Sequence, residues 1–451
     1  MSVSGVVAER RLAVGTVAVG LWVAVAAWFV IVGSDLMWVV ALGDVVRSGG
    51  GVPSSLPFAS APQAEWHNPI ALAQVLFSAV HGLGPAGLAS FQLLIVAVTL
   101  TVVLAEGRRL GGGEGRGALV VSLVVIGASV HLVIARLPSL SLVPFVVAMA
   151  VLRHQHDRPS RAIWWLVPLF IVWGNLHGGV LVGLAVLGVF LVASPGGGPL
   201  LRRVGVGAGC ALTFVVTSAG VHTPAYYISA LGNEAAARGT DLWARPSLTH
   251  PLDVAMIAAA VVLAVLAVRG RPPLWEWLAT AGLVLGTASA GRHGIWLLLF
   301  LAPAAMRARE PARVALAPVA ARVVAIVTLV AVAASAAAAF TVRGAAVGPP
   351  GSEVVDVVRK AAQGRPVLAS EPLAETLAQA GVTVWAANPI DAFPRDVQAS
   401  FLDFLHDGTV PDDPDIALVV VGADAAPAVE RGGDWTPSLR VDGYVLLTPA
   451  P

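Results

Sequence analysis

The stretch LAVGTVAVGLWVAVAAWFVIVGSDLMW, residues 12–38, decides the fold, because an apolar run of helix length stops at a carboxylate. A transmembrane helix needs about 20 apolar residues, and residues 12–33 supply that length without a charge. Arg10 and Arg11 precede the run, which is too long for a signal-peptide core and lacks a clear cleavage site. We therefore predict a retained first span whose far end presents Asp35.

The rest of the chain repeats this apolar pattern. Of its 451 residues, 57% are apolar and 12% are charged, whereas soluble domains carry about 25% charged residues. The net charge is +1, and no basic run with interleaved aromatic residues occurs, so we expect no nucleic acid partner. We predict an α-helical polytopic membrane protein with about eleven transmembrane helices. The predicted spans are 12–33, 85–105, 117–135, 138–152, 162–175, 178–194, 204–220, 252–268, 274–290, 294–306 and 322–342.

The positions of the arginines predict the orientation of these spans. Cytoplasmic loops of membrane proteins carry an excess of basic residues. With the N-terminus in the cytoplasm, the opposite loops between spans receive only Arg47, Arg136, Arg238, Arg245 and Arg292, and most other arginines are cytoplasmic. An odd number of spans before the tail preserves this pattern. We therefore expect a multi-pass protein of the inner (plasma) membrane with a cytoplasmic N-terminus and an extracytoplasmic C-terminus.

Two domains are expected. Residues 1–343 would form the transmembrane domain, with 35–85 as its first extracytoplasmic loop. Within that loop, the helical spacing of Ile70, Ala73, Leu76 and Val80 predicts an amphipathic surface helix. Residues 344–451 alternate short strands with helices, which is typical of a small α/β domain with a mostly parallel sheet. We find neither GxGxxG nor GxxxxGK[ST], so nothing indicates a nucleotide site.

Asp35 and Arg136 are the first candidate site residues on the extracytoplasmic face. An ionisable group at membrane depth is expensive and by default marks function. Asp35 could act as a general base or hold a metal ion, although a helix end exposed to lipid headgroups is an equally simple interpretation. Arg136, in the turn IARLPS, could bind a phosphate through its planar fork, or it could snorkel from a loop.

Three further polar breaks contribute candidates. Glu65, His67 and Asn68 in AEWHNP suit a sugar site or acid–base work, and equally a helix start before Pro69. Asn175 and His177 in WGNLHGG lie among glycines that permit close approach of a ligand or a tight turn. Arg292 and His293 in SAGRHG could bind the same phosphate as Arg136, or they form an ordinary polar break between spans.

The joint pattern of these candidates is more informative than any one of them. Under the predicted topology, Asp35, His67, Arg136, His177 and Arg292 all fall on one face of the membrane. Cations could hold the phosphate of a lipid-linked substrate, while a carboxylate deprotonates an acceptor hydroxyl. The sequence therefore favours a site for a lipid phosphate at that face.

Two stretches resemble the GT-C class of glycosyltransferases, in its uncharacterised bacterial branch. They are SDLMWVVALGDVVRSGGGVPSSLPFASAPQAEWHNPIALAQVLFSA, residues 34–79, and WGNLHGG, residues 173–179. The resemblance implies a polyprenyl-phosphate-linked sugar donor, a cell-envelope glycan, lipid or protein as acceptor, hexosyl or pentosyl transfer, and Asp35 as catalytic base. Many members show paired acids in the first loop, whereas Asp44 is nine residues beyond Asp35. No cofactor is therefore assigned, and a divalent metal ion stays open.

Two other functions are compatible with a multi-pass chain. A transporter or lipid flippase typically shows inverted repeats and ionisable groups near the membrane midplane, but here the charges gather at one face and no repeat is evident. A non-catalytic envelope protein, whose tail binds a partner, is the other alternative. The transferase, unlike the transporter, predicts that Asp35, Arg136 and Arg292 converge on one outside-facing cavity that opens laterally to lipid.

Overall fold

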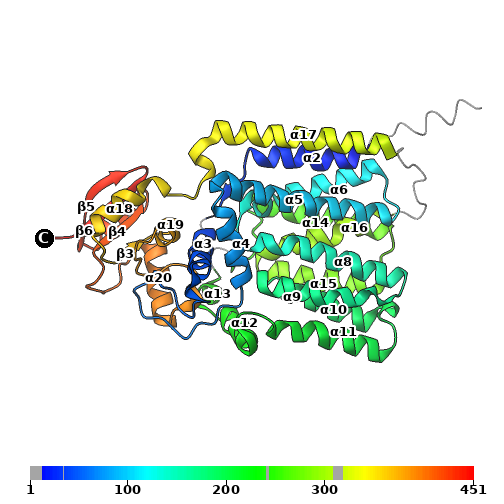
Figure 1. The fold of residues 1–451 in the computed structure, drawn as a ribbon, viewed down its shortest axis with the longest axis horizontal. Helices are drawn as coiled ribbons and strands as arrows, with labels where there is room; N and C mark the ends of the chain where they lie inside the picture. The colour runs from blue at the N-terminus through cyan, green and yellow to red at the C-terminus, as the bar shows by residue number, and fades with distance from the viewer. Residues whose placement is uncertain (1–12, 34, 240–242, 308–317) are drawn as a thin grey trace, which may run out of the picture.

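A bundle of apolar helices makes up the part of the chain before residue 344 (Figure 1). The computed structural model describes residues 13–33, 35–239, 243–307 and 318–451, without the side chains of 318–321, so Arg10 and Arg11 lie outside the described residues. The bundle helices are α2 (Val14–Ala27), α5 (Gly84–Arg109), α6 (Glu114–Gly127), α8 (Leu142–Asp157), α9 (Leu166–Leu176), α10 (Val180–Ala193), α11 (Leu200–Leu212), α14 (Pro251–Arg269), α15 (Leu274–Ser289), α16 (Gly294–Met306) and α17 (Pro318–Arg343). All 13 residues of α16 are buried, as expected of a helix that is apolar on every side.

The helices at the edge of the bundle present apolar faces to the surroundings. Among the described residues, four helices are long and apolar enough to cross a membrane, and the bent pair Leu200–Val215 and Gly220–Arg238 would add a fifth if it forms one span. The others are shorter, so a total of eleven crossings stays a prediction. In an 18-residue apolar stretch of the span Arg322–Val347, only 6% of the residues are buried. Exposed apolar surface of this extent is typical of a lipid-facing helix, and the chain is a membrane protein.

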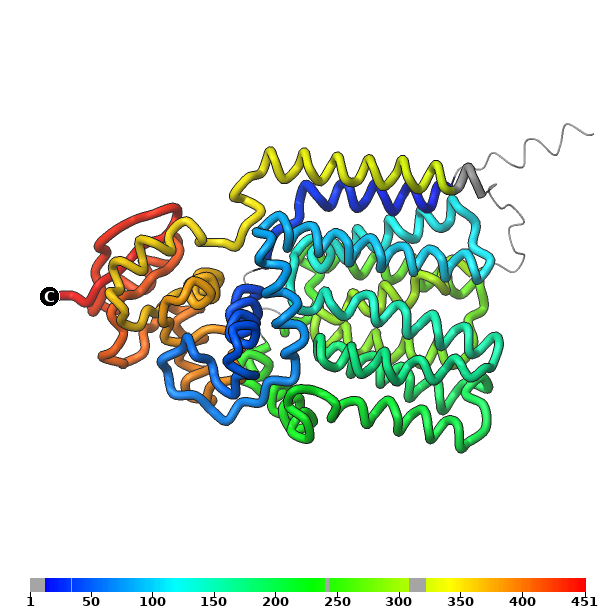
Figure 2. The backbone as a smooth tube through the Cα atoms, in the orientation of Figure 1, coloured from blue at the N-terminus to red at the C-terminus, as the bar shows by residue number. Residues whose placement is uncertain are grey.

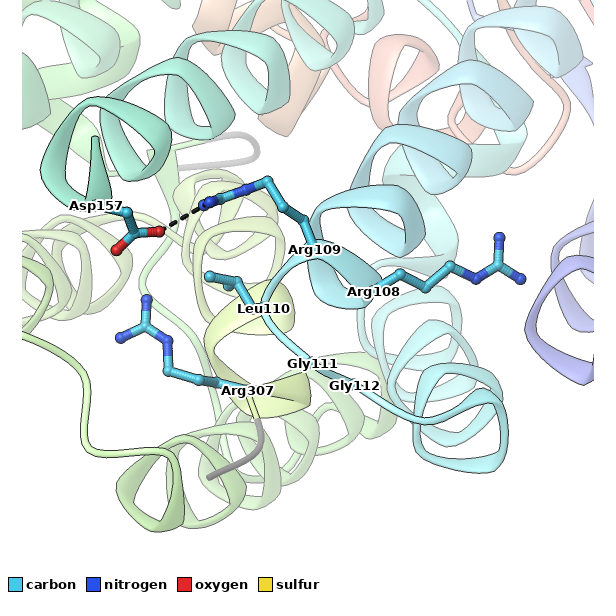
Figure 3. Close-up of a pocket in the computed structure, with 7 residues that line it drawn as sticks. All are labelled: Arg108, Arg109, Leu110, Gly111, Gly112, Asp157 and Arg307. Atoms are coloured by element: carbon cyan, nitrogen blue, oxygen red, sulfur yellow. Dashed lines mark hydrogen bonds and ion pairs between the residues drawn. The ribbon is translucent and has the colours of Figure 1, made fainter. Parts of the chain in front are cut away.

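Arg108, Arg109 and Arg307 gather at one end of the bundle, and Figure 3 shows Arg109 paired with Asp157. Arg109 pairs with Glu106 and Asp157, each at 2.8 Å, and a cavity of about 390 Å³ lies beside it. Deeper in, Arg153 and Glu276 are each 1% exposed, and Nε of Arg153 lies 3.2 Å from Oε1 of Glu276. Arg307 donates to the same oxygen at 2.9 Å. Because Arg109 and Arg307, which line the cavity, are already paired with acids, the cavity does not have the excess positive charge of an anion site.

The opposite end carries short elements that cap the bundle (Figure 1). Strands β1 (Ile31–Val32) and β2 (Ile134–Ala135) pair in parallel there. Helix α3 (Leu36–Val45) follows β1 and packs closely on α4 (Ala71–His81), which occupies the position of the predicted amphipathic helix. Helices α12 (Thr223–Leu231) and α13 (Glu234–Arg238) complete this end. These connections, rather than the bundle helices, position the candidate site.

The C-terminal segment, residues 344–451, is built on a mixed sheet. Its strands β3 (Val367–Ala369), β4 (Leu418–Gly422), β5 (Trp435–Val441) and β6 (Tyr444–Pro449) lie in the order β3-β4-β6-β5. Helices α18 (Val355–Ala362), α19 (Leu373–Gln379), α20 (Arg395–Asp407) and α21 (Ala426–Glu430) accompany them. Only β3 and β4 pair in parallel, so the expectation of a mostly parallel sheet was wrong. The difference is a β5–β6 hairpin, whose Asp442–Gly443 turn has a positive φ at both residues.

The first loop of the bundle runs beside the C-terminal segment (Figure 2). Backbone hydrogen bonds join this loop to the sheet. Val384 N donates to Phe58 O, and Ser60 N donates to Val384 O, both at 2.9 Å. Val384 also bridges β3 through Val367. In place of the predicted strand TVWAA, the structure has a single bridging residue, Val384, that links the loop to the sheet. The C-terminal segment is therefore attached directly to the residues that follow Asp35.

Candidate functional site

Asp35 and Arg136 form an ion pair at the capped end of the bundle. The β1–β2 pairing places Val32 beside Ala135, so the residues that follow the two strands emerge together. Nη2 of Arg136 lies 2.7 Å and Nε 3.2 Å from Oδ2 of Asp35. The side chains of Asp35 and Arg136 are 23% and 15% exposed. Both donors meet one oxygen, which leaves Oδ1 of Asp35 to other partners.

A glycine allows this close approach. Gly33 N donates to Ala135 O at 2.8 Å. A Cβ at residue 33 would lie 2.9 Å from that carbonyl oxygen and 3.0 Å from Oδ1 of Asp35, which is tighter than ordinary van der Waals contact. Any larger residue at position 33 would therefore push the two chain segments apart and separate Asp35 from Arg136.

Arg292 supplies a second cation close to Arg136. Its guanidinium carbon lies 3.4 Å above the ring of Trp243, a cation–π contact that holds the side chain in place. Its Nε is buried and has no hydrogen-bond partner among the described residues. Burial, followed by repulsion from Arg136, lowers the pKa of Arg292 to about 10. Two neighbouring arginines, of which one pairs with Asp35, leave a net positive charge that favours an anion.

His177 lies beside these arginines in an orientation that its neighbours dictate. Trp173 Nε1 donates to Ser141 Oγ at 2.8 Å, and Ser141 Oγ lies 2.8 Å from Nδ1 of His177. Gly179 N also donates to Nδ1 at 2.9 Å, so the proton of the neutral ring is on Nε2. Burial, then the charges of Arg292 and Arg136, lower the pKa of His177 to about 3. The ring is therefore neutral and can donate one hydrogen bond.

The adjacent residues of the same motifs have different surroundings. Burial, followed by the charge of Arg292, lowers the pKa of His293 to about 4, so this ring is also neutral next to the cations. Nδ2 of Asn175 donates to Ile171 O at 2.9 Å and to Val216 O at 2.6 Å. Asn175 thus holds the loop after α11, and its amide donors are already engaged.

Glu65, His67 and Asn68 lie at a junction between the two long loops. The Glu65 side chain is 86% exposed and 3.4 Å from His67, and the His67 ring stacks on His222 at 4.1 Å between centroids. Asn68 is 3% exposed and exchanges hydrogen bonds with Gln74. Among the described residues, no contact joins these three to Asp35, Arg136 or Arg292. The structure therefore brings together Asp35, Arg136, His177, Arg292 and His293, and places the other predicted residues outside that group.

Two acids of the C-terminal segment were missed by the sequence analysis. Glu375 on α19 is fully buried and lies close enough to Asp35 for their charges to interact. Asp391 is half-buried near Tyr226, and its buried Oδ2 has no hydrogen-bond partner among the described residues. A glutamate inside the apolar run PLAETLAQA was the available signal, because a charge in a buried helix needs a reason.

No metal ion is assigned to this site. The described residues contain no group of three or more His, Cys, Asp or Glu side chains arranged to hold one.

The fold is that of GT-C glycosyltransferases. ArnT from Cupriavidus metallidurans bound to undecaprenyl phosphate aligns with a TM-score of 0.51 at 16% identity, over 95% of this chain and 97% of that one. An apo oligosaccharyltransferase from Archaeoglobus fulgidus aligns with a TM-score of 0.51 at 11% identity, over 90% and 69%. Arabinofuranosyltransferase AftD from Mycobacteria gives 0.49 at 16%, and the chain, aligned over 96% of its own length, spans 41% of AftD. No family model and no curated protein sequence matches this chain.

Proposed function

We propose that this protein is a membrane glycosyltransferase that moves a sugar from a polyprenyl-phosphate donor to an acceptor of the cell envelope. The observation that carries the proposal is the meeting of one carboxylate, Asp35, with the neighbouring cations Arg136 and Arg292 at one end of the bundle. The GT-C fold supports it, because the similar ArnT structure holds undecaprenyl phosphate. Among the described residues, Nε of Arg292 has no hydrogen-bond partner, which leaves a cation available to a substrate phosphate beside the paired Asp35.

The chemistry follows from where charge develops. The acceptor oxygen attacks the anomeric carbon of the sugar, its proton passes to Asp35, and the bond between that carbon and the phosphate oxygen breaks. The electron pair stays on the phosphate, whose negative charge rises from about one to two. Arg136 and Arg292 stabilise that charge in a partly buried site, where electrostatic effects are stronger than in water. When the donor binds, Arg136 contacts both the phosphate and Asp35. Its hold on Asp35 is then weaker, so that Asp35 accepts the proton more readily.

The test is transfer by the purified full-length chain in detergent. A panel of polyprenyl-phosphate sugars, including hexoses and pentoses, is incubated with envelope glycan and lipid acceptors, and release of polyprenyl phosphate is measured. Release with at least one donor that depends on an added acceptor is expected. A lack of release across the panel, from protein that is folded by circular dichroism, contradicts the proposal.

Replacement of Arg292 by glutamine should weaken donor binding. A hydrogen bond to a charged group contributes about 1.5–3 kcal/mol, so the KM for the donor should rise roughly 10- to 100-fold. Arg245→Gln is the matched control, because Arg245 belongs to the same loop as Trp243 and is exposed. Steady-state kinetics with varied donor measures both. Equal KM values for Arg292→Gln and wild type would remove Arg292 from the phosphate site.

We also propose the location of the two parts of the chain. Residues 1–343 form the multi-pass domain of the inner membrane with a cytoplasmic N-terminus, and residues 344–451 form an extracytoplasmic domain. Cys210 is the sole cysteine and is buried, so the background labelling by a maleimide should be low. In intact cells, a membrane-impermeant maleimide should label Glu353→Cys, at an exposed position of the C-terminal segment, and should spare Arg158→Cys. Labelling in the reverse pattern would invert the topology.

A further inference from the structure

Helix α19 brings a carboxyl group to the start of α3. The two helices pack against each other, and Asp35 is the residue immediately before α3. Residues Leu373–Ala378 of α19 are all buried, and Glu375 among them is 0% exposed. A carboxyl group in this position is expensive unless it is paired or protonated. A purely structural contact would be served better by an apolar residue.

Glu375 is only half satisfied by its surroundings. Asn388 donates to its Oε1 from Nδ2 at 2.9 Å and from the backbone nitrogen at 3.3 Å. Its Oε2 is buried and has no partner among the described residues. The charged groups close to it are Asp35, which is paired with Arg136, and Glu371, which shares Asn388 through a 2.5 Å hydrogen bond. One oxygen is thus fixed in position while the other is left for a proton.

We propose that Glu375 is the second carboxyl group of the site and that its negative charge strengthens Asp35 as the proton acceptor. The inference rests on the proposed function, and it makes the C-terminal segment a part of the active site. Arg136 opposes proton uptake by Asp35, because a neighbouring cation favours the ionised acid, whereas a neighbouring anion favours the protonated one. Glu375 offsets Arg136 through that second effect. It acts on Asp35 and does not itself contact the sugar.

The sign of the pH dependence follows. Burial, the largest cause, with a further contribution from the charge of Asp35, raises the pKa of Glu375 to about 7. Below that pH Glu375 is neutral and gives Asp35 no help, and above it Glu375 is charged. The transfer rate should therefore rise as the pH increases through about 7. The stability of the folded state changes in the opposite direction. Burial favours neutral Glu375, so its contribution to stability is lost as the pH rises through the same value.

The first experiment needs no activity. The infrared carboxylic acid band that disappears in Glu375→Gln reports the protonation of Glu375 in the full-length protein, and it should titrate near pH 7. In Asp35→Asn the same band should titrate at a lower pH, because the like charge is gone, whereas Asp44→Asn should leave it unchanged. An unaltered titration in Asp35→Asn overturns the proposal, whatever the protein catalyses.

The second experiment measures transfer against pH. Glu375→Gln keeps the shape and the Asn388 contact, so it should fold, but should lose the rise in kcat near pH 7 and fall roughly three- to tenfold below wild type above it. Glu375→Asp should restore part of the rise, and Glu353→Gln, at an exposed position of the same segment, should match wild type. A wild-type pH profile in Glu375→Gln overturns the inference alone. If Asp35→Asn shifts the titration of Glu375 but no donor supports transfer, the proposed function is contradicted and the inference about Glu375 is not.

Discussion

Replacement of Asp35 by asparagine should lower kcat for sugar transfer by roughly 10²- to 10⁴-fold, the usual contribution of a positioned general base. Asparagine is nearly isosteric and its amide oxygen can still accept from Arg136, so the β1–β2 junction should survive. It cannot take the proton of the acceptor hydroxyl. The KM for the donor should change little, because Arg136 becomes free for the phosphate. Initial rates of polyprenyl phosphate release at saturating donor measure the effect.

Asp44→Asn is the control for that substitution. Asp44 lies on α3, roughly 13.5 Å along the helix axis from Asp35 at about 1.5 Å per residue, and accepts a hydrogen bond from Ser78 at 2.5 Å. Its loss should leave kcat within a small factor of wild type. Equal activity of Asp35→Asn and wild type, or equal losses in the two variants, would show that Asp35 is not the base.

Glu276→Ala should destabilise the bundle by about 3–5 kcal/mol, the usual result of removing one partner from a buried ion pair. Arg153 is 1% exposed and would keep only the hydrogen bond to Phe300 O at 2.7 Å and the contact with the Phe300 ring. Arg307 would also lose its partner. Apparent unfolding midpoints in detergent, followed by tryptophan fluorescence, measure the loss.

Asp157→Ala tests whether burial of the ion pair is the reason for the large loss of stability expected in Glu276→Ala. Asp157 pairs with Arg109 at the same end of the bundle (Figure 3). Its side chain is 39% exposed, however, and Arg109 keeps its ion pair with Glu106. Such partly exposed pairs contribute about 0–1 kcal/mol. The Glu276 variant should therefore unfold well before the Asp157 variant, and coincident midpoints would contradict a stabilising role for the buried pair.

The arrangement of the bundle could be predicted largely from local patterns. An apolar run of helix length can be recognised from the sequence alone, so the predicted spans coincide closely with helices such as α5, α14 and α16. The grouping of Asp35, Arg136, His177 and Arg292 followed from topology, because residues at the same end of neighbouring helices meet. Whether each helix crosses the bilayer stays a prediction.

The parts that were missed depend on contacts between distant segments. The hairpin β5–β6 had a local signal, since Asp442–Gly443 between two strand-like stretches is typical of a tight hairpin turn. Glu375 had almost no local signal, because its position near Asp35 comes from the packing of α19 on α3. His67 shared the same face as Asp35, yet its neighbour is His222. Topology places a residue on a side of the membrane, whereas only packing decides what it touches.

The strand-like bridge between the first loop and the C-terminal sheet has a consequence for biosynthesis. Val384 follows Ala59 by 325 positions, so at roughly 5–20 residues per second the ribosome needs roughly 16–65 seconds to deliver it. Throughout that interval the nascent loop lacks the partner that holds it in shape. The candidate site can therefore mature only after synthesis is nearly complete, and a premature stop before residue 384 would leave the bundle without the segment that completes that site.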